Sequence, residues 1–508
     1  MESMFIENLF GALGLLFNVN TLLVILLGVI LGLFLGILPG IGGTAALAIT
    51  FPITYEMTAG NGILFLIAVY SAAEYGGSIP AILINTPGTG AAAATILDGY
   101  PLSQKGFPKK AMQISLASGV FGGIFSTLVF ILMGPLLAWV GLQFGPIEMF
   151  AVGVFGLSIV CSLVGKSVVK GFLAVAIGAL LASIGPSNFS GLRFTFDQHY
   201  LLDGIPMAVA FIGFFAVPQA IKMITAETEA SAHVDLKKSG KNDFLAFRQL
   251  KKLFMTMVRG SLVGSIIGII PGAGTGIACF IAYNEEKRFS KRPEEFGKGV
   301  EEGISAPESA NNSVVGACLV PTLTLGIPGS SAAALIMGLL IMKGINPGPM
   351  LFQEQGRLVL LIFTGLIIVN IFLLLVGLLG INVFALVTRI PQRILGPFII
   401  VLVLTGTYSY QQNANHAVMA MILGIFGYIL SRAQIPNIPL VLAFIMAPIM
   451  EYNLIHALMI HRGDYMVIFK SPICVGILVL SAYSAVYGYI REKRSQAREN
   501  QNQDKSAE

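Results

Sequence analysis

Long apolar stretches separated by short polar ones make up most of this chain between residues 21 and 490. One of them, Leu358–Leu379, contains no charged residue over its whole length. About 20 such residues wound into a helix cross the hydrocarbon core of a bilayer. A membrane β-barrel would instead alternate polar and apolar positions over segments of about ten residues. The pattern therefore predicts an all-α polytopic membrane protein with about 10–12 transmembrane helices and with re-entrant hairpins where apolar segments are too short to cross.

Four polar stretches interrupt this pattern, and each contains Lys or Arg. They are residues 103–110, 223–257, 284–303 and 491–508. Basic loops stay on the cytoplasmic side of a membrane, so we expect all four, including the C-terminus, in the cytoplasm. None reaches the roughly 50 residues that a soluble domain needs, which argues against a built-in ATPase. The composition of the last stretch predicts a disordered tail.

The overall composition agrees with a membrane protein. Hydrophobic residues make up 55% of the chain and charged residues 11%, whereas soluble domains are about 25% charged. The net charge of +5 reflects basic loops, and we expect no binding to nucleic acid. The four cysteines lie inside apolar segments and the five histidines lack metal-ligand spacing, so the sequence predicts neither a structural metal site nor another cofactor.

Two blocks of sequence occur twice in the same order. Residues 32–42 match residues 264–274 at an offset of 232, around the strings Gly-Ile-Leu-Pro-Gly and Gly-Ile-Ile-Pro-Gly. Residues 80–88 match residues 321–329 at an offset of 241. Between the blocks, Glu74 is expected near the place of Glu308, at an offset of 234. The sequence therefore predicts an internal duplication with a short insertion in the second copy.

The positions of basic residues predict that the two copies are inverted. The loop after the first block has no Lys or Arg in the first copy and five in the second, and the bias reverses in the loop after the second block. If the two copies have opposite orientations, equivalent loops lie on opposite sides of the membrane, and the basic residues must then occur in different loops of each copy. The predicted division is 1–222 for the first transmembrane repeat, 223–257 for a cytoplasmic connecting loop, 258–490 for the second repeat with the C-terminal helices, and 491–508 for the tail.

Pro-Gly pairs inside the matched blocks predict broken helices. Proline lacks a backbone donor and glycine tolerates unusual dihedral angles, and the breaks fall at Pro39, Gly40, Pro87, Pro271, Gly272 and Pro328. At membrane depth a break is tolerated only where it is buried in protein or faces a water-filled cavity. The N-terminus of a half-helix attracts a carboxylate, while free carbonyl groups suit a cation.

Small hydroxyl and amide side chains surround these breaks and bind anions or sodium without a permanent charge. The candidate substrate-binding residues are Thr44, Asn85, Thr86, Gly88, Thr89, Gly90, Thr275, Asn311, Asn312, Gly329, Ser330 and Ser331. The candidate cation-binding residues are Glu74, Glu308, Ser305 and Ser309, because a carboxylate inside a membrane is costly and usually functional. The alternative interpretations are ordinary helix kinks and packing positions for the former, and helix caps at the interface for the two glutamates.

Several long strings resemble one family, the large membrane subunit of tripartite tricarboxylate transporters. These strings are GILPGIGGTAALAITFP, NTPGTGAAAATILDGYPL, PGAGTGIACFIAY, GISAPESANNSVVGA and PTLTLGIPGSSAAALIMGLL. The similarity extends from about Gly28 to Pro472. The family's motif regions fall here on Pro39–Thr44, Asn85–Gly90, Pro271–Thr275, Ser305–Ser313 and Gly326–Ser331.

The resemblance implies a multi-pass protein of the bacterial inner membrane that imports tricarboxylates such as citrate, or related carboxylates. It implies coupling to a co-transported cation, Na+ or H+, and alternating access. It also implies two protein partners, namely a small membrane subunit and a periplasmic solute-binding protein. An intramembrane enzyme and an anion channel are the alternatives. Because no nucleophile lies beside a histidine base in the polar run 305–313, we expect no enzyme activity.

Overall fold

The computed structural model describes residues 2–164, 167–187, 189, 191–225, 243–387 and 392–507. Within these ranges, ten helices are long and apolar enough to cross a membrane. The ten candidate spans are Val19–Ile37, Ala59–Ile84, Pro108–Gly141, Pro146–Leu163, Met207–Thr225, Phe247–Ile269, Gly356–Phe384, Ala414–Arg432, Asn437–Ile460 and Pro472–Arg494. The prediction of an all-helical polytopic membrane protein is therefore confirmed.

The first half of the chain is helical apart from one short hairpin. Its helices are α1 (Glu2–Leu16), α2 (Val19–Ile37), α3 (Gly43–Thr50), η1 (Phe51–Thr54), α4 (Ala59–Gly76), α5 (Ser78–Ile84), α6 (Ala92–Gln104), α7 (Pro108–Gly141), α8 (Pro146–Leu163), α9 (Val168–Ala182), η2 (His199–Leu201), α10 (Met207–Phe211) and α11 (Val217–Thr225). A π-helical turn over 212–216 joins the last two into one span. The hairpin pairs β1 (Gly185–Ser187) with β2 (Gly191–Arg193) in antiparallel register.

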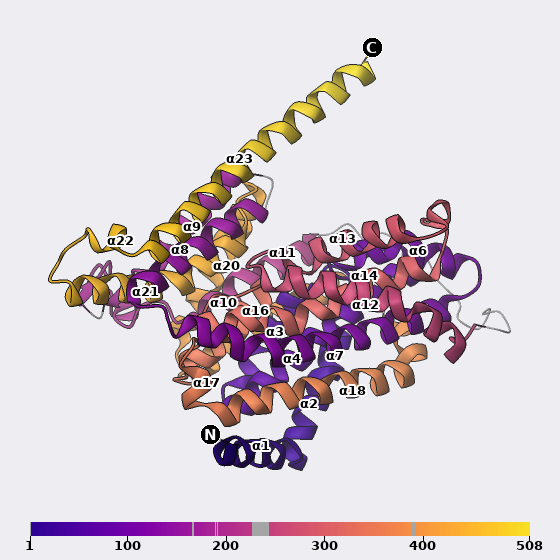
Figure 1. Ribbon diagram of the computed structural model, residues 1–508, viewed down its shortest axis with the longest axis horizontal. Helices are drawn as coiled ribbons and strands as arrows, with labels where there is room; N and C mark the ends of the chain where they lie inside the picture. The colour runs from indigo at the N-terminus through magenta and orange to yellow at the C-terminus, as the bar shows by residue number, and fades with distance from the viewer. Residues whose placement is uncertain are drawn as a thin grey trace.

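The second half begins with the same succession of helices, although α13 is longer than α3. Its helices are α12 (Phe247–Ile269), α13 (Gly274–Phe289), η5 (Pro293–Glu295), α14 (Glu301–Ala317), α15 (Leu319–Leu325), α16 (Ser331–Met342), α17 (Leu351–Glu354), α18 (Gly356–Val387), α19 (Gln392–Ser409), α20 (Ala414–Arg432), α21 (Asn437–Ile460), α22 (Val467–Lys470) and α23 (Pro472–Ala507). The order α12 to α16 thus corresponds, element by element, to the order α2 to α6. In Figure 1, α4, α7, α12, α14 and α18 form the main body, while α8, α9, α21 and α23 gather toward one side.

Two helices form the buried centre of this body. α4 is buried from Gly62 to Gly76, and α14 is buried from Gly303 to Ala317. α4 packs against α2 and α18, whereas α14 packs against α7 and α12. Helices in lipid approach closely where small residues face each other. A Cβ atom placed on Gly32 of α2 would overlap the backbone of Val69 in α4, and one on Gly264 of α12 would overlap Ala310 in α14.

This packing corrects the predicted pairing of the two glutamates. Val69 and Ala310, which occupy equivalent places, are 241 positions apart, so α4 and α14 match at the offset of the second block. At this offset Glu74 corresponds to Val315, and Glu308 corresponds to Ile67. The extra residues of the second copy therefore lie before α14, in α13 and the loop after it. Glu74 and Glu308 are not equivalent, because a shared residue type does not fix helix register.

The connecting loop 223–257 and the C-terminal tail 491–508 differ in extent from their predicted bounds. α11 continues to Thr225 and α12 begins at Phe247, so both helices extend into the predicted loop 223–257. Residues 226–242 of that loop lie outside the described residues. α23 continues to Ala507 and extends away from the main body (Figure 1), whereas the sequence predicts disorder from residue 491. Glu, Arg, Gln, Lys and Ala are strong helix formers, and a helix propagates readily once it has begun.

Candidate functional site

The first matched block ends one helix and begins another in each half. α2 ends at Ile37 and α3 begins at Gly43, while α12 ends at Ile269 and α13 begins at Gly274. The turns contain Gly40 with φ of +87° and Gly272 with φ of +78°, a conformation that favours glycine. No side chain caps the N-terminus of α3 or α13. Both helices therefore present free N–H groups and partial positive charge.

The second matched block breaks the chain between α5 and α6 and between α15 and α16. In the first half Asn85 ends α5 in the left-handed region, with φ of 57° and ψ of 26°. In the second half Gly326 ends α15 at φ of 68° and ψ of 24°. Asparagine is one of the few residues other than glycine that adopts this conformation readily. The structure thus gives Asn85 a backbone role, in addition to the substrate role predicted for its side chain.

After the second break of each half, a side-chain hydroxyl caps the helix that follows. The hydroxyl of Thr89 accepts a hydrogen bond of 3.3 Å from the N–H of Ala92, and Ser330 accepts one of 3.1 Å from the N–H of Ala333. Side-chain capping satisfies one of the free donors at a helix N-terminus. Thr89 and Ser330 therefore have a local structural function at equivalent positions.

Contacts between the halves bring the breaks together. The hydroxyl oxygens of Thr44 and Ser331 lie 2.7 Å apart, which joins the first break of one half to the second break of the other. Within the second half, the N–H of Gly272 donates to the carbonyl oxygen of Gly329 over 3.0 Å. The carboxyl group of Glu74 faces the hydroxyls of both Thr89 and Thr275, so it connects the second break of the first half to the first break of the second half.

The last contact closes a ring through all four breaks. A Cβ atom on Gly88 would overlap the carbonyl of Gly36 in the final turn of α2. We call the four segments 38–44, 85–91, 270–275 and 326–331 the break ring. Parts of it are open, since Asn85, Thr86 and Gly90 are exposed and Thr44, Thr275 and Ser331 are half-buried.

Glu74 lies at the inner side of the break ring. Its side chain is buried, and its Oε2 atom has no hydrogen-bond partner. The side-chain amide of Asn311, from α14, donates to the backbone carbonyl of Glu74 over 3.3 Å. The Oδ1 atom of Asn311 is buried without a partner. Of the polar residues of α14 predicted to bind substrate, Asn311 is therefore the one that the structure places beside the ring.

Glu308 occupies a second polar position, about one turn before Asn311 in α14. Its Oε1 atom accepts hydrogen bonds from Ser78 of α5, over 2.5 Å, and from Thr95 of α6. The hydroxyl of Ser115, from α7, also faces this carboxylate. Glu308 is buried, and its Oε2 atom has no hydrogen-bond partner. Among the described residues, neither Glu308 nor Glu74 forms an ion pair with a Lys or Arg side chain.

Three other candidates face away from the ring. The hydroxyl of Ser305 lies 2.8 Å from that of Ser118 on α7, and Ser309 bonds to carbonyl groups of its own helix. Asn312 is buried against Gly119 of α7, and neither of its side-chain polar atoms has a hydrogen-bond partner. The structure therefore does not bring Ser305 and Ser309 to the two glutamates with which they were grouped.

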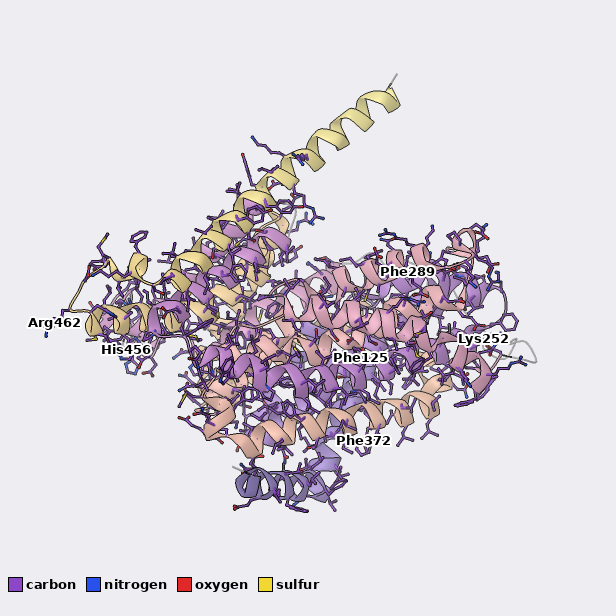
Figure 2. All side chains as sticks on the ribbon, viewed as in Figure 1. Phe125, Lys252, Phe289, Phe372, His456 and Arg462 are labelled. Atoms are coloured by element: carbon purple, nitrogen blue, oxygen red, sulfur yellow. The ribbon has the colours of Figure 1, made fainter. Side chains whose placement is uncertain are left out.

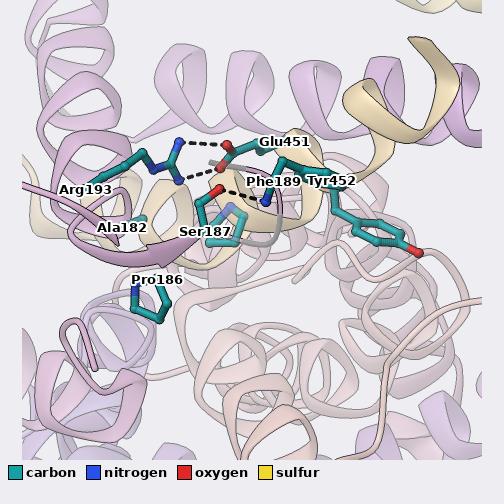
Figure 3. Close-up of a pocket in the computed structure, with 8 residues that line it drawn as sticks. Ala182, Pro186, Ser187, Phe189, Arg193, Glu451 and Tyr452 are labelled. Carbon is teal, nitrogen blue, oxygen red and sulfur yellow. Dashed lines mark hydrogen bonds and ion pairs between the residues drawn. The ribbon is translucent and has the colours of Figure 1, made fainter. Parts of the chain in front are cut away.

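A shallow pocket beside the β-hairpin contains none of the predicted residues. Figure 3 shows Arg193 of β2 in a two-pronged ion pair with Glu451 of α21, with distances of 2.7 and 2.9 Å. Ser187 and Tyr452 are among its lining residues. The ion pair connects the hairpin to α21. Because both charges are already paired, neither is left free to bind a ligand in this pocket.

Sequence reasoning missed Ser78, Thr95 and Ser115. Ser78 and Thr95 flank the second break on either side, but serine and threonine are common in membrane helices and bond to their own backbone. Ser115 lies in α7, outside both matched blocks. Only the packing of α5, α6 and α7 around α14 reveals that the three residues surround one carboxylate.

The break ring, the pair of buried carboxylates and the ten candidate spans together define a polytopic membrane protein with a polar centre. The sequence pattern of the tripartite tricarboxylate transporter TctA family matches residues 22–442. The chain belongs to this family, and it is a membrane subunit of a tripartite tricarboxylate transporter. This membership confirms the family resemblance on which the sequence analysis relied.

Two proteins of Agrobacterium vitis are similar to the chain. The first, an uncharacterized 52.8 kDa protein of the TAR-I ttuC′ 3′ region, is 36% identical over 457 residues, which cover 90% of each chain. The second, an uncharacterized protein of the TAR-II ttuC′ 3′ region, is 38% identical over 236 residues, which cover 46% of this chain and 98% of the relative. No solved structure matches the chain.

Proposed function

We propose that this subunit imports a tricarboxylate or a related carboxylate by alternating access, and that the carboxylate binds at the break ring. The observation that supports this most strongly is the meeting of four helix breaks from both halves of the chain at one place. Transporters built from repeats bind substrate where broken helices meet near the middle of the membrane. A ring that joins two halves also changes shape when one half moves against the other.

The chemistry of the ring suits an anion. The uncapped N-termini of α3 and α13 offer backbone N–H donors, and Thr44 and Thr275 add half-buried hydroxyl groups in their first turns. Such donors bind carboxylates without a lysine or arginine. Asn311, with its unpartnered oxygen, lies next to Glu74 at the inner side.

We further propose that the two halves are inverted in the membrane. The equivalent order of α2 to α6 and α12 to α16 supports a duplication, and the exchange of basic loops supports opposite orientations. Figure 2 labels Lys252 and Phe289 toward one end of the molecule, and His456 and Arg462 at the other. We assign the end with Lys252 and the loop 284–303 to the cytoplasm of a bacterial cell, and the C-terminus to the same side.

Electroneutrality favours coupling to a cation. Glu74 and Glu308 are buried without an ion pair among the described residues, and a carboxylate substrate adds further negative charge. A buried unpaired charge is strongly unfavourable. A co-transported Na+ or H+ removes this cost, which links substrate entry to the cation gradient. The tripartite name of the family supports two partners, a small membrane subunit and a periplasmic solute-binding protein.

Uptake into proteoliposomes tests this function. The full-length chain is reconstituted with its small membrane subunit, the binding protein is added outside, and labelled citrate and related carboxylates are supplied. We expect accumulation that requires an inward cation gradient and the binding protein. Rapid downhill flux that needs neither would contradict the proposal and would identify an anion channel instead.

A further inference from the structure

We infer that Glu308, Ser78, Thr95 and Ser115 form a Na+ site that is separate from the substrate position at the break ring. This inference rests on the proposed transport function for its physiological role, but the site itself is defined by geometry. Its four side chains come from four different helices, α14, α5, α6 and α7. Sodium is a hard cation, and hard cations prefer carboxylate and hydroxyl oxygens.

The hydrogen bonds around Glu308 leave the required lone pairs free. Both Ser78 and Thr95 donate to the same oxygen, Oε1. A hydroxyl that donates its one hydrogen keeps acceptor capacity for a cation. The second carboxylate oxygen has no partner at all. The arrangement therefore gathers a carboxyl group and several unused oxygen lone pairs in one buried place.

Unpartnered oxygen atoms at this carboxyl group favour Na+ over a proton. The hydroxyl of Ser115, which faces Glu308, and the Oε2 atom of Glu308 are both buried without a hydrogen-bond partner. Buried polar atoms are normally satisfied, so each exception calls for a ligand or water. A proton on Glu308 engages only two oxygen atoms, whereas a coordinated cation draws on Oε2 and on the hydroxyl oxygens of Ser78, Thr95 and Ser115 together.

The register of the two halves indicates that this site occurs once. Ile67 occupies the place in α4 that Glu308 occupies in α14, and an isoleucine side chain offers no ligand. Glu74 does not supply a second copy, because it corresponds to Val315 and faces Thr89 and Thr275 instead. We therefore expect one Na+ at Glu308 for each chain.

The same geometry explains how Na+ would act on substrate binding. Ser78 lies before the break at residues 85–91 and Thr95 lies after it, and both bond to Glu308 of the other half. A cation coordinated by all three holds the two arms of this break against α14. Because the break is one quarter of the ring, loss of Na+ loosens the place where the carboxylate binds.

Binding of radiolabelled Na+ to the purified full-length chain in lipid nanodiscs, without substrate, tests the site. We expect saturable binding by the natural chain, at least a tenfold loss of affinity in Glu308→Gln, and a smaller loss in Ser115→Ala and Thr95→Val. Ser126→Ala is the matched control, since Ser126 is equally buried in α7 but bonds to the carbonyl of Gly123 in its own helix. It should bind Na+ like the natural chain.

Natural affinity in Glu308→Gln, or no Na+ binding by the natural chain, would overturn this inference. Size-exclusion profiles and melting temperatures establish that each variant is folded, and if Glu308→Gln is not, Ser115→Ala and Thr95→Val decide the matter. The proposed transport function fails separately, through absence of carboxylate uptake by the natural chain. Uptake driven by a proton gradient alone would retain that function and would reject Na+ at Glu308.

Discussion

The hydroxyl oxygens of Thr44 and Ser331 lie 2.7 Å apart although 287 positions separate the two residues. Each follows a helix break, one in each half of the chain. The pair thus joins the two halves at a half-buried point beside the uncapped N-terminus of α3. This contact is the most direct sign that the breaks form a single polar centre.

Removing one hydroxyl of this pair should weaken substrate binding. A hydrogen bond contributes about 1 kcal/mol, so we expect Thr44→Ala to raise the KM for carboxylate uptake by about five- to tenfold with little change in the maximal rate. Initial uptake rates in proteoliposomes give both values. Thr364→Ala is the control, because Thr364 bonds to the backbone of its own helix. An unchanged KM in Thr44→Ala would remove Thr44 from the site.

Close backbone packing at the second break predicts a difference between two neighbouring glycines. A Cβ atom on Gly88 would overlap Gly36 and Gly77, whereas one on Gly90 meets nothing within 4 Å. Overpacking of this kind costs about 1–3 kcal/mol, so Gly88→Ala should lower the melting temperature in detergent while Gly90→Ala should not. Equal melting temperatures for the two variants would show that the ring is loosely packed.

The left-handed conformation of Asn85 gives a third prediction. Val has no access to this region without strain, so Asn85→Val should destabilise the protein by about 1–2 kcal/mol relative to Asn85→Gly. Glycine already occupies the equivalent place at residue 326. Thermal unfolding of both variants measures the difference. If Asn85→Val is as stable as Asn85→Gly, the backbone role assigned to Asn85 is wrong.

Asp98 of α6 secures the loop in front of α14. Its carboxylate accepts hydrogen bonds from the N–H groups of Gly297, Gly299 and Val300 and from the hydroxyl of Tyr283, and it is fully buried. Hydrogen bonds to charged groups contribute about 1.5–3 kcal/mol, so Asp98→Asn should destabilise the protein by about 2 kcal/mol or more.

Hydrogen exchange locates that effect. Amide exchange in residues 297–300 should accelerate in Asp98→Asn and change less in Tyr283→Phe, which removes one donor and keeps the carboxylate. The melting temperature should follow the same order. If exchange in this loop stays at its natural rate, Asp98 does not hold the N-terminus of α14.

Much of the fold was predictable because it depends on local rules. Continuous apolar segments require helices in lipid, and the matched Pro-Gly blocks indicated where helices end and begin. The register between α4 and α14 was not predictable in the same way, because Glu74 and Glu308 look equivalent in sequence although Glu74 corresponds to Val315, two helical turns after Glu308. Likewise, nothing in the sequence pairs Thr44 with Ser331, since that contact depends on how the two halves pack.

The position of Glu308 shows the same limit. Its carboxylate was a candidate because a buried charge is costly, but its partners Ser78, Thr95 and Ser115 come from three other helices. The serines predicted beside it, Ser305 and Ser309, point to other neighbours. The cost of burying a charge identified the carboxylate, whereas only the packing of the helices shows which hydroxyl groups surround it.

Protection of the break ring by substrate tests the central claim most directly. Cysteines introduced as Thr44→Cys and Thr275→Cys are labelled with a maleimide in the reconstituted transporter, and Lys291→Cys in the loop before α14 is the control. We predict that a transported carboxylate with Na+ slows labelling at residues 44 and 275 several-fold and leaves residue 291 unchanged. Labelling of both ring cysteines at the substrate-free rate, in variants that still take up the carboxylate, would contradict the account.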